Sequence, residues 1–279
     1  MKVYKKIPER RGKMLFLFLI IILIIITYIQ NKKINIKTYN IETNKVLNSY
    51  KILQIADLHN NFKNNKNYLL KKIKNINPDI IVFTGDEIDG NKDFETLNLD
   101  NDITLFTLIK ELNYPMYYVY GNHEQSLSEK NLKYLANKLE QYNVKILNDK
   151  SEEFKELKLV GLNNKYDSRK ITFTLSDLTK DNNGKYVTLL THRPELFGSI
   201  YSKFPIDTIL CGHTHGGQFK LPIVGGLYAP NQGLFPKYDS GRFKENECQM
   251  IVSSGLGNSS FPIRIMNSPE LVIIDIYPK

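Results

Sequence analysis

Cysteine is scarce in this chain of 279 residues, where only Cys211 and Cys248 occur. Two cysteines cannot form a disulfide framework, and neither belongs to a Cys-x-x-Cys pair, so a disulfide-stapled fold and a dithiol motif are excluded. Cys211 ends an apolar run and is predicted to be a buried small residue. The sequence also lacks internal repeats and, after its N-terminal segment, any Pro/Gly-rich linker. These absences predict a single domain over residues 49–279.

Acidic residues are fewer than basic ones, which gives a formal net charge of +9. Residues 1–13 hold six basic side chains and one acid, and the remaining excess is spread along the chain. An excess of basic residues that is distributed along the chain is typical of a solvated basic surface. We therefore predict no specific nucleic-acid or protein partner. Hydrophobic residues make up 42% and charged residues 24%, which allows a core of ordinary size.

One long hydrophobic run, residues 14–29, contains no charged residue. As a helix its 16 residues would span about 24 Å, against about 30 Å for a bilayer core, and flanking lysines can extend it. A cleaved signal peptide and a buried core helix are the alternatives, but residues 25–35 contain no A-x-A-like cleavage pattern. We therefore predict a transmembrane signal anchor.

Basic residues are concentrated before this run. The positive-inside rule places residues 1–13 in the cytoplasm as a basic tail and the rest of the chain on the outer face of the plasma membrane, as a single-pass protein. Residues 30–48 are polar with weak apolar alternation, which predicts a tether that merges into a first edge strand. A flexible tether of about 15 residues would reach about 20–25 Å.

Strand-like and helical patterns alternate after residue 50. The strand-like runs are residues 51–56, 79–84, 116–120, 186–190 and 207–210. Apolar residues at helical spacing lie between them in three stripes: Leu69, Ile73, Ile76; Leu105, Leu108, Leu112; and Leu132, Leu135, Leu139, Tyr142. This alternation predicts an α/β fold with a largely parallel sheet. Gly-rich turns between Gly216 and Tyr277 predict a second, more antiparallel sheet.

Polar residues that can bind metal follow each of the five strand-like runs, and all five histidines of the chain lie among them. Ligands of open α/β sheets bind beyond the carboxyl ends of the strands, so these side chains should converge. A single histidine after a strand is usually structural. Here, however, all five histidines of the chain lie at such positions beside Asp, Asn or another His, which favours a metal site. Imidazoles and carboxylates without thiolates suit manganese, iron or zinc. The spacing of Asp57/His59 and His213/His215 requires irregular or extended backbone.

The complete set of these segments resembles the calcineurin-like metallophosphoesterase superfamily. The segments are Asp57-x-His59, Gly85-Asp86-x-x-Asp89, Gly121-Asn122-His123-Glu124, His192 and Gly212-His213-x-His215. The stretches GHTHGGQ (212–218), APNQGLFPKY (229–238) and GLGNSSFPIR (255–264) resemble its membrane-associated bacterial branch, which includes the YkuE- and YaeI-type phosphoesterases. Ala56 departs from the serine that often precedes the first motif, at a position that is not a ligand.

The resemblance implies a four-layer α/β/β/α sandwich behind the transmembrane helix. It also implies two divalent transition-metal ions, manganese foremost, with zinc or iron as alternatives, in two ligand groups bridged by Asp86. The first group is completed by Asp57, His59 and His215, and the second by Asn122, His192 and His213.

The resemblance further assigns roles around the metals. His123 is expected to be the general acid, oriented by Asp89, for which a turn-capping role is the alternative. Glu124 is expected to support its loop. Asn122, Arg193 and Gln218 are candidate phosphate contacts.

Together these features predict a binuclear metal-dependent hydrolase of phosphodiester, pyrophosphate or phosphomonoester bonds, in which a hydroxide activated by both metals attacks phosphorus. A membrane-linked or cell-envelope substrate is the first hypothesis. The second is a nuclease or soluble-substrate phosphodiesterase merely localised by its anchor. The third, a non-catalytic binding scaffold, fits poorly because every ligand position is filled.

Overall fold

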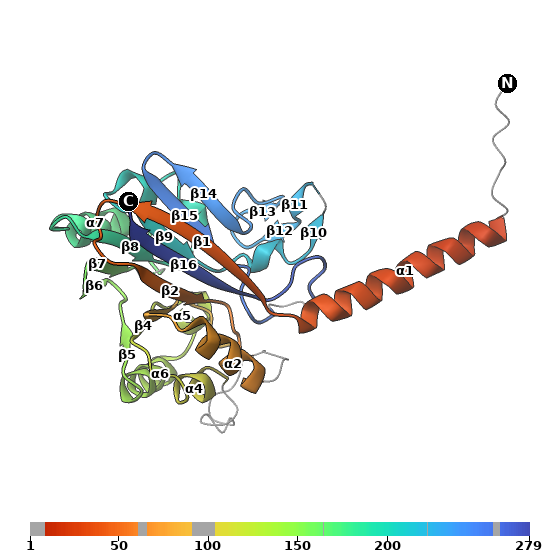
Figure 1. The fold of residues 1–279 in the computed structure, drawn as a ribbon, viewed down its shortest axis with the longest axis horizontal. Helices are drawn as coiled ribbons and strands as arrows, with labels where there is room; N and C mark the ends of the chain where they lie inside the picture. Colours follow the sequence, from red (N-terminus) through yellow and green to blue (C-terminus); the bar gives the residue numbers. More distant parts are fainter. Residues whose placement is uncertain (1–8, 61–65, 91–103, 164, 222, 259–262) are drawn as a thin grey trace.

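A computed structural model describes residues 9–60, 66–90, 104–163, 165–221, 223–258 and 263–279. A long N-terminal helix, α1 (Glu9–Lys32), projects from a body of stacked sheets and helices (Figure 1). Its 24 residues correspond to about 36 Å of helix. The part from Gly12 to Lys32 is long and apolar enough to cross a membrane, and its apolar side chains are exposed. The predicted run 14–29 thus lies inside a longer helix, while residues 1–8 of the basic tail lie outside the described residues.

The connection between α1 and the body is short. Strand β1 (Asn35–Thr43) begins after Lys33 and the buried Ile34, and it pairs in parallel with β16 (Glu270–Pro278) over all nine residues. β1 is an edge strand of its sheet. Residues 35–43 therefore form the edge strand predicted within residues 30–48, and the flexible reach expected of a 15-residue tether does not apply to them, because their backbone is hydrogen-bonded to β16.

The first sheet has the strand order β1-β16-β2-β3-β4-β5. Strands β2 (Tyr50–Ile55), β3 (Ile80–Phe83), β4 (Met116–Tyr118) and β5 (Val144–Ile146) are mutually parallel, and β16 runs antiparallel to β2. Helices α2 (Lys66–Ile76), α4 (Thr104–Ile109) and α6 (Glu129–Gln141) contribute their apolar faces to the core on one side of this sheet.

The second sheet has the order β14-β15-β9-β8-β7-β6. Its central strands β7 (Leu157–Gly161), β8 (Tyr186–Leu190), β9 (Thr208–Cys211) and β15 (Cys248–Val252) are parallel. The edge strands β6 (Lys150–Phe154) and β14 (Gly241–Glu245) are antiparallel to their neighbours. Helix α7 (Ser168–Thr179) and two 3₁₀ turns, η1 (Pro194–Leu196) and η2 (Tyr201–Lys203), cover its outer face.

Three hydrophobic cores separate the four layers. One lies between the first sheet and its helices, and another between the second sheet and α7. The third lies between the sheets, where Ile52 and Val82 of the first pack with Leu159 and Leu210 of the second. Alternate residues of a strand face opposite sides, so a strand such as β2 serves two cores through Leu53 and Ile52. The predicted α/β/β/α sandwich behind one N-terminal apolar helix is confirmed.

The division of strands between the sheets differs from the sequence-based expectation. The five predicted strands do not share one sheet, because the first three belong to the first sheet and the last two to the second. The second sheet is also not confined to the C-terminal third, since it begins at Lys150, and the last strand, β16, returns to the first sheet. Apolar periodicity marks a strand as buried without indicating which sheet it joins.

Candidate metal centre

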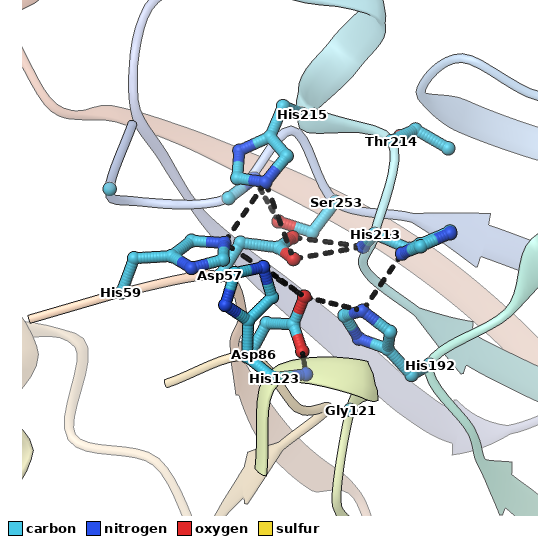
Figure 2. A network of polar contacts seen from close by, with 12 residues as sticks. Asp57, His59, Asp86, Gly121, His123, His192, His213, Thr214, His215 and Ser253 are labelled. Carbon is cyan, nitrogen blue, oxygen red and sulfur yellow. Dashed lines mark hydrogen bonds and ion pairs between the residues drawn. The ribbon is translucent and has the colours of Figure 1, made fainter. Parts of the chain in front are cut away.

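The Asp and His side chains predicted as ligands lie close together, beyond the ends of strands from both sheets (Figure 2). Asp57 and His59 follow β2, Asp86 follows β3, and the four-residue helix α5 (Asn122–Gln125) follows β4. His192 follows β8, while His213 and His215 follow β9, the latter in the 3₁₀ turn η3 (His215–Gly217). The two sheets therefore contribute their strand ends to a single site.

The backbone at five of these ligands adopts the left-handed conformation that favours glycine. The φ angles are 53° at Asp57, 51° at His59, 57° at Asp86, 77° at His213 and 49° at His215. Each such residue costs about 1–3 kcal/mol, so strain of this kind usually persists at functional sites. The irregular backbone predicted from the two i, i+2 pairs is present at both of them.

The first cluster joins Asp57, His59 and His215. The Nε2 atoms of His59 and His215 are 3.1 Å apart, and the Nε2 atom of His215 is 3.9 Å from Oδ1 of Asp57. All three side chains are buried. The backbone N–H of His213 donates to both oxygens of Asp57 at 3.0 Å, which fixes the carboxylate.

The second cluster joins Asp86, His192 and His213. The Nε2 atom of His192 lies 3.0 Å from Oδ2 of Asp86 and 3.0 Å from Nδ1 of His213. The other ring nitrogen of His192, Nδ1, lies 2.9 Å from the carbonyl oxygen of Thr84. A ring proton on Nδ1 can be donated to that carbonyl, so Nε2 is the ring nitrogen that faces the other donors and could act as a metal ligand.

Asp86 lies between the two clusters. Its Oδ2 atom faces His192 at 3.0 Å and Nε2 of His59 at 3.9 Å, while Oδ1 accepts a hydrogen bond of 2.8 Å from the backbone N–H of His123. One carboxylate thus faces donors of both groups, as a bridging ligand requires. Gly121 is needed beside it, because a Cβ atom there would lie 2.2 Å from Oδ1 of Asp86.

The pKa values of the four buried histidines depend on burial and on the central carboxylate. Burial lowers the pKa of His59 to about 4 and that of His213 to about 3, and it also lowers the pKa of His215. Burial would lower the pKa of His192 too, but the adjacent carboxylate of Asp86 raises it to about 10.

The two carboxyl groups respond differently to burial. Burial raises the pKa of Asp57 to about 7. For Asp86 burial acts in the same direction but is outweighed by His192, so its pKa lies below the ordinary value. Three neutral imidazoles and an ionised Asp86 are donors that divalent transition metals require, and a metal ion bound at His192 would take the place of its Nε2 proton. Within each cluster the donor atoms lie within 4.8 Å of one another. The residues present therefore fit two such ions.

Helix α5 begins at Asn122, next to His123. The side chain of Asn122 is exposed, and its part as a ligand remains a prediction. His123 retains 25% exposure of its side chain, whereas His192 is fully buried. Its Nε2 lies 4.0 Å from Oδ2 of Asp86, and its Nδ1 lies 3.5 Å from Oδ1 of Asp89. The structure brings Asp89 to the ring nitrogen opposite the one that faces the cluster.

The two other candidate phosphate contacts are engaged with protein groups. Arg193 donates from Nε to the carboxylate of Glu195 at 2.7 Å. Gln218 is buried, and its Nε2 donates to the carbonyl of Ile263 at 2.8 Å. Their roles toward phosphate remain predictions.

Glu124 holds the loops beside the candidate ligands in place, as expected. Its buried carboxylate accepts hydrogen bonds from the backbone N–H groups of Asp86 (2.9 Å), Ile88 (3.0 Å) and Gly121 (2.8 Å), and from the hydroxyl of Tyr118 (2.7 Å). One side chain therefore links the loops that follow β3 and β4.

Two residues beside the ligands were not singled out from the sequence. Nδ2 of Asn231 lies 3.1 Å from Nε2 of His213, and Nη2 of the fully buried Arg264 lies 3.4 Å from Nδ1 of His215. Both belong to stretches quoted above for their resemblance, residues 229–238 and 255–264, which was the available signal. Their contacts with the histidines could not be predicted from the sequence, because these residues become neighbours only in the folded chain.

Comparison with known proteins agrees with this geometry. The sequence profile described as calcineurin-like phosphoesterase matches residues 50–217. The chain belongs to this family. Among its relatives, an uncharacterised metallophosphoesterase of Aquifex aeolicus is 26% identical over 94% of this chain and 99% of its own length. YkuE of Bacillus subtilis is 27% identical over 81% of this chain and 79% of its own.

Two further matches bear on the branch and the fold. The Escherichia coli phosphodiesterase YaeI is 32% identical over 32% of this chain and 31% of its own length. The predicted membership of the YkuE/YaeI-type branch is confirmed. Plasmodium GAP50, described as the anchor in the inner membrane complex, has the same fold, with a TM-score of 0.50, 11% identity and 82% of each chain covered.

Proposed function

We propose that this chain is a binuclear phosphoesterase anchored to the plasma membrane by α1, with manganese as the native metal and with a membrane-linked or cell-envelope phosphoester as substrate. Family membership and the clustered donors support metal-dependent phosphoester hydrolysis. The observation that carries the two-metal assignment is Asp86, whose carboxylate faces donors of both clusters.

The bound ions would supply a hydroxide at neutral pH and neutralise charge on the phosphoryl group. The protein's own part begins with orientation: Glu124 fixes the loops that present Asp86 and Gly121. His123 lies on the solvent side of the clusters with Nε2 directed toward Asp86. A proton on this Nε2 would pass to the leaving oxygen, and the carboxylate of Asp89 at Nδ1 would stabilise the charged ring before transfer. The amide of Asn122 would donate to a phosphate oxygen.

A substrate panel tests this proposal on the full chain. The metal-depleted protein should be inactive and should regain activity with manganese, zinc or iron. Two probes separate the substrate hypotheses: bis(4-nitrophenyl) phosphate in solution and a polyprenyl diphosphate carried in nanodiscs. A higher kcat/KM on the nanodisc probe is expected. A preference for the soluble diester would favour the localised phosphodiesterase or nuclease, and no hydrolysis with any metal would leave only the binding scaffold.

The outward orientation of the catalytic domain is a further part of the proposal. It is supported by the six basic residues before the apolar run and by the length of α1. Protease added to intact spheroplasts should digest the catalytic domain and leave a small N-terminal fragment. Full protection of the domain would place it in the cytoplasm and remove the argument for an outer-leaflet substrate.

A further inference from the structure

Exposed large apolar side chains gather on one region of the catalytic domain. Of the thirteen in the described residues outside α1, eight fall between residues 221 and 266. We call these eight the apolar rim: Leu221, Ile223, Val224, Tyr228, Leu234, Phe235, Ile263 and Met266. Ile223 is fully exposed and Leu234 is 68% exposed. Single exposed apolar residues are normal, but a concentrated group marks an interaction surface.

Backbone hydrogen bonds join the parts of the apolar rim into one substructure. Two small hairpins carry most of it, β10 (Lys220–Leu221) with β11 (Gly225–Gly226) and β12 (Tyr228–Ala229) with β13 (Gly233–Leu234). The N–H of Leu227 donates to the carbonyl of Phe219 at 2.8 Å, and the N–H of Phe235 donates to the carbonyl of Leu227 at 2.9 Å. The N–H of Lys220 donates to the carbonyl of Ile265 at 2.9 Å, which attaches the segment of Ile263 and Met266.

The apolar helix α1 is fixed beside this substructure. The side chain of Asn31 donates from Nδ2 to the carbonyl of Arg264 at 2.7 Å and accepts through Oδ1 from the N–H of Arg264 at 3.1 Å. Arg264 lies between the rim residues Ile263 and Met266. Because only Lys33 and Ile34 separate α1 from β1, the helix end cannot move far from the rim. In Figure 1, α1 leaves the body on the side that carries β10 to β13.

A membrane crossed by α1 must therefore begin next to the apolar rim. Lys32 and Lys33 at the helix end are exposed, as is Lys237 beyond Phe235, and lysines at a bilayer boundary keep their ammonium groups in the aqueous interface while their stems lie along apolar surface. Apolar side chains flanked by lysines are typical of surfaces that enter the headgroup–acyl boundary, by about 5–10 Å. The bilayer itself is thus the partner whose chemistry fits this surface.

The same substructure reaches the metal centre from its inner side. Asn231, in the turn between β12 and β13, contacts His213, and Arg264 contacts His215. We propose that the apolar rim inserts into the leaflet adjoining the C-terminal end of α1, so that the metal centre is held at the bilayer surface and accepts phosphoesters whose apolar part stays in the membrane. This inference rests on the proposed membrane anchoring and deepens the proposed substrate class.

Fluorescence tests insertion directly, because the chain contains no tryptophan. The full chain carrying Phe235→Trp is reconstituted in nanodiscs of phosphatidylglycerol and phosphatidylcholine, with or without brominated acyl chains. Brominated lipid should quench its emission to an extent comparable with that of Tyr28→Trp, since Tyr28 lies on α1 about 4.5 Å along the helix axis from Asn31. Phe173→Trp is the matched control, because Phe173 is 70% exposed on α7, on the opposite side of the body, and should not be quenched.

The three variants distinguish the two ways in which the inference can fail. In the first case, Tyr28→Trp is quenched but Phe235→Trp is quenched no more than Phe173→Trp. This result would overturn the insertion of the apolar rim and leave the membrane anchor in place. No quenching of Tyr28→Trp would overturn the membrane anchoring and the inference with it. Leu234→Trp repeats the measurement at a neighbouring rim position, should Phe235→Trp fail to fold. None of these readouts depends on activity, so hydrolysis is tested separately.

Discussion

Replacing Asp86 by asparagine is expected to reduce the metal content of the purified full chain from about two ions to less than one, because the bridging role proposed for Asp86 would serve both clusters. An amide lacks the negative charge that Asp86 places opposite His192 at 3.0 Å and His59 at 3.9 Å. The loss of several kcal/mol of transition-state stabilisation should lower kcat/KM by at least about 10³-fold. Elemental analysis and steady-state kinetics on the same preparation measure both effects.

The design of this variant separates metal loss from misfolding. Asparagine retains an oxygen that can accept the hydrogen bond from the N–H of His123, so the loop is expected to keep its shape. Asp177→Asn is the control, because Asp177 is an exposed residue of α7 that forms an ion pair with Lys180. That variant should keep full metal content and activity. Two bound ions in a folded Asp86→Asn protein would contradict the bridging assignment.

Replacing His123 by asparagine is expected to preserve the metals and to impair the chemical step. General acid catalysis contributes about 10²–10⁴-fold, so kcat on an alkyl phosphoester should fall by about that factor. Nitrophenyl esters should lose much less, because nitrophenolate leaves without a proton. The reason lies in the position of His123, which keeps its ring partly exposed with Nε2 4.0 Å from Asp86.

Comparing both substrate types distinguishes proton donation from simple binding. Equal losses on alkyl and nitrophenyl esters would exclude the acid role for His123. Asp89→Asn provides a graded comparison, since Asp89 lies 3.5 Å from Nδ1 of His123 and is proposed to act through that ring. It should show the same leaving-group dependence with a smaller loss.

Much of the candidate metal centre could be predicted from the sequence, because its Asp and His side chains directly follow strand ends. Asp57 and His59 follow one strand directly, and His213 and His215 follow another, so each pair is placed by its own segment. The apolar faces of the helices could also be predicted from the sequence: Leu69, Ile73 and Ile76 are buried on α2, as their spacing predicts.

The sequence by itself predicted the Asp and His side chains that meet in the two clusters, the four-layer class through its resemblance, and an apolar N-terminal helix. Tertiary structure alone decided which strands share a sheet and that the predicted edge strand, β1, pairs with the last strand, β16. It also decided how α1 is held, through contacts between Asn31 and Arg264, 233 positions apart. Arg264 in turn reaches His215 across 49 positions. Such contacts follow from the packing of whole layers, and no local pattern of residues specifies a partner that becomes adjacent only when the chain has folded.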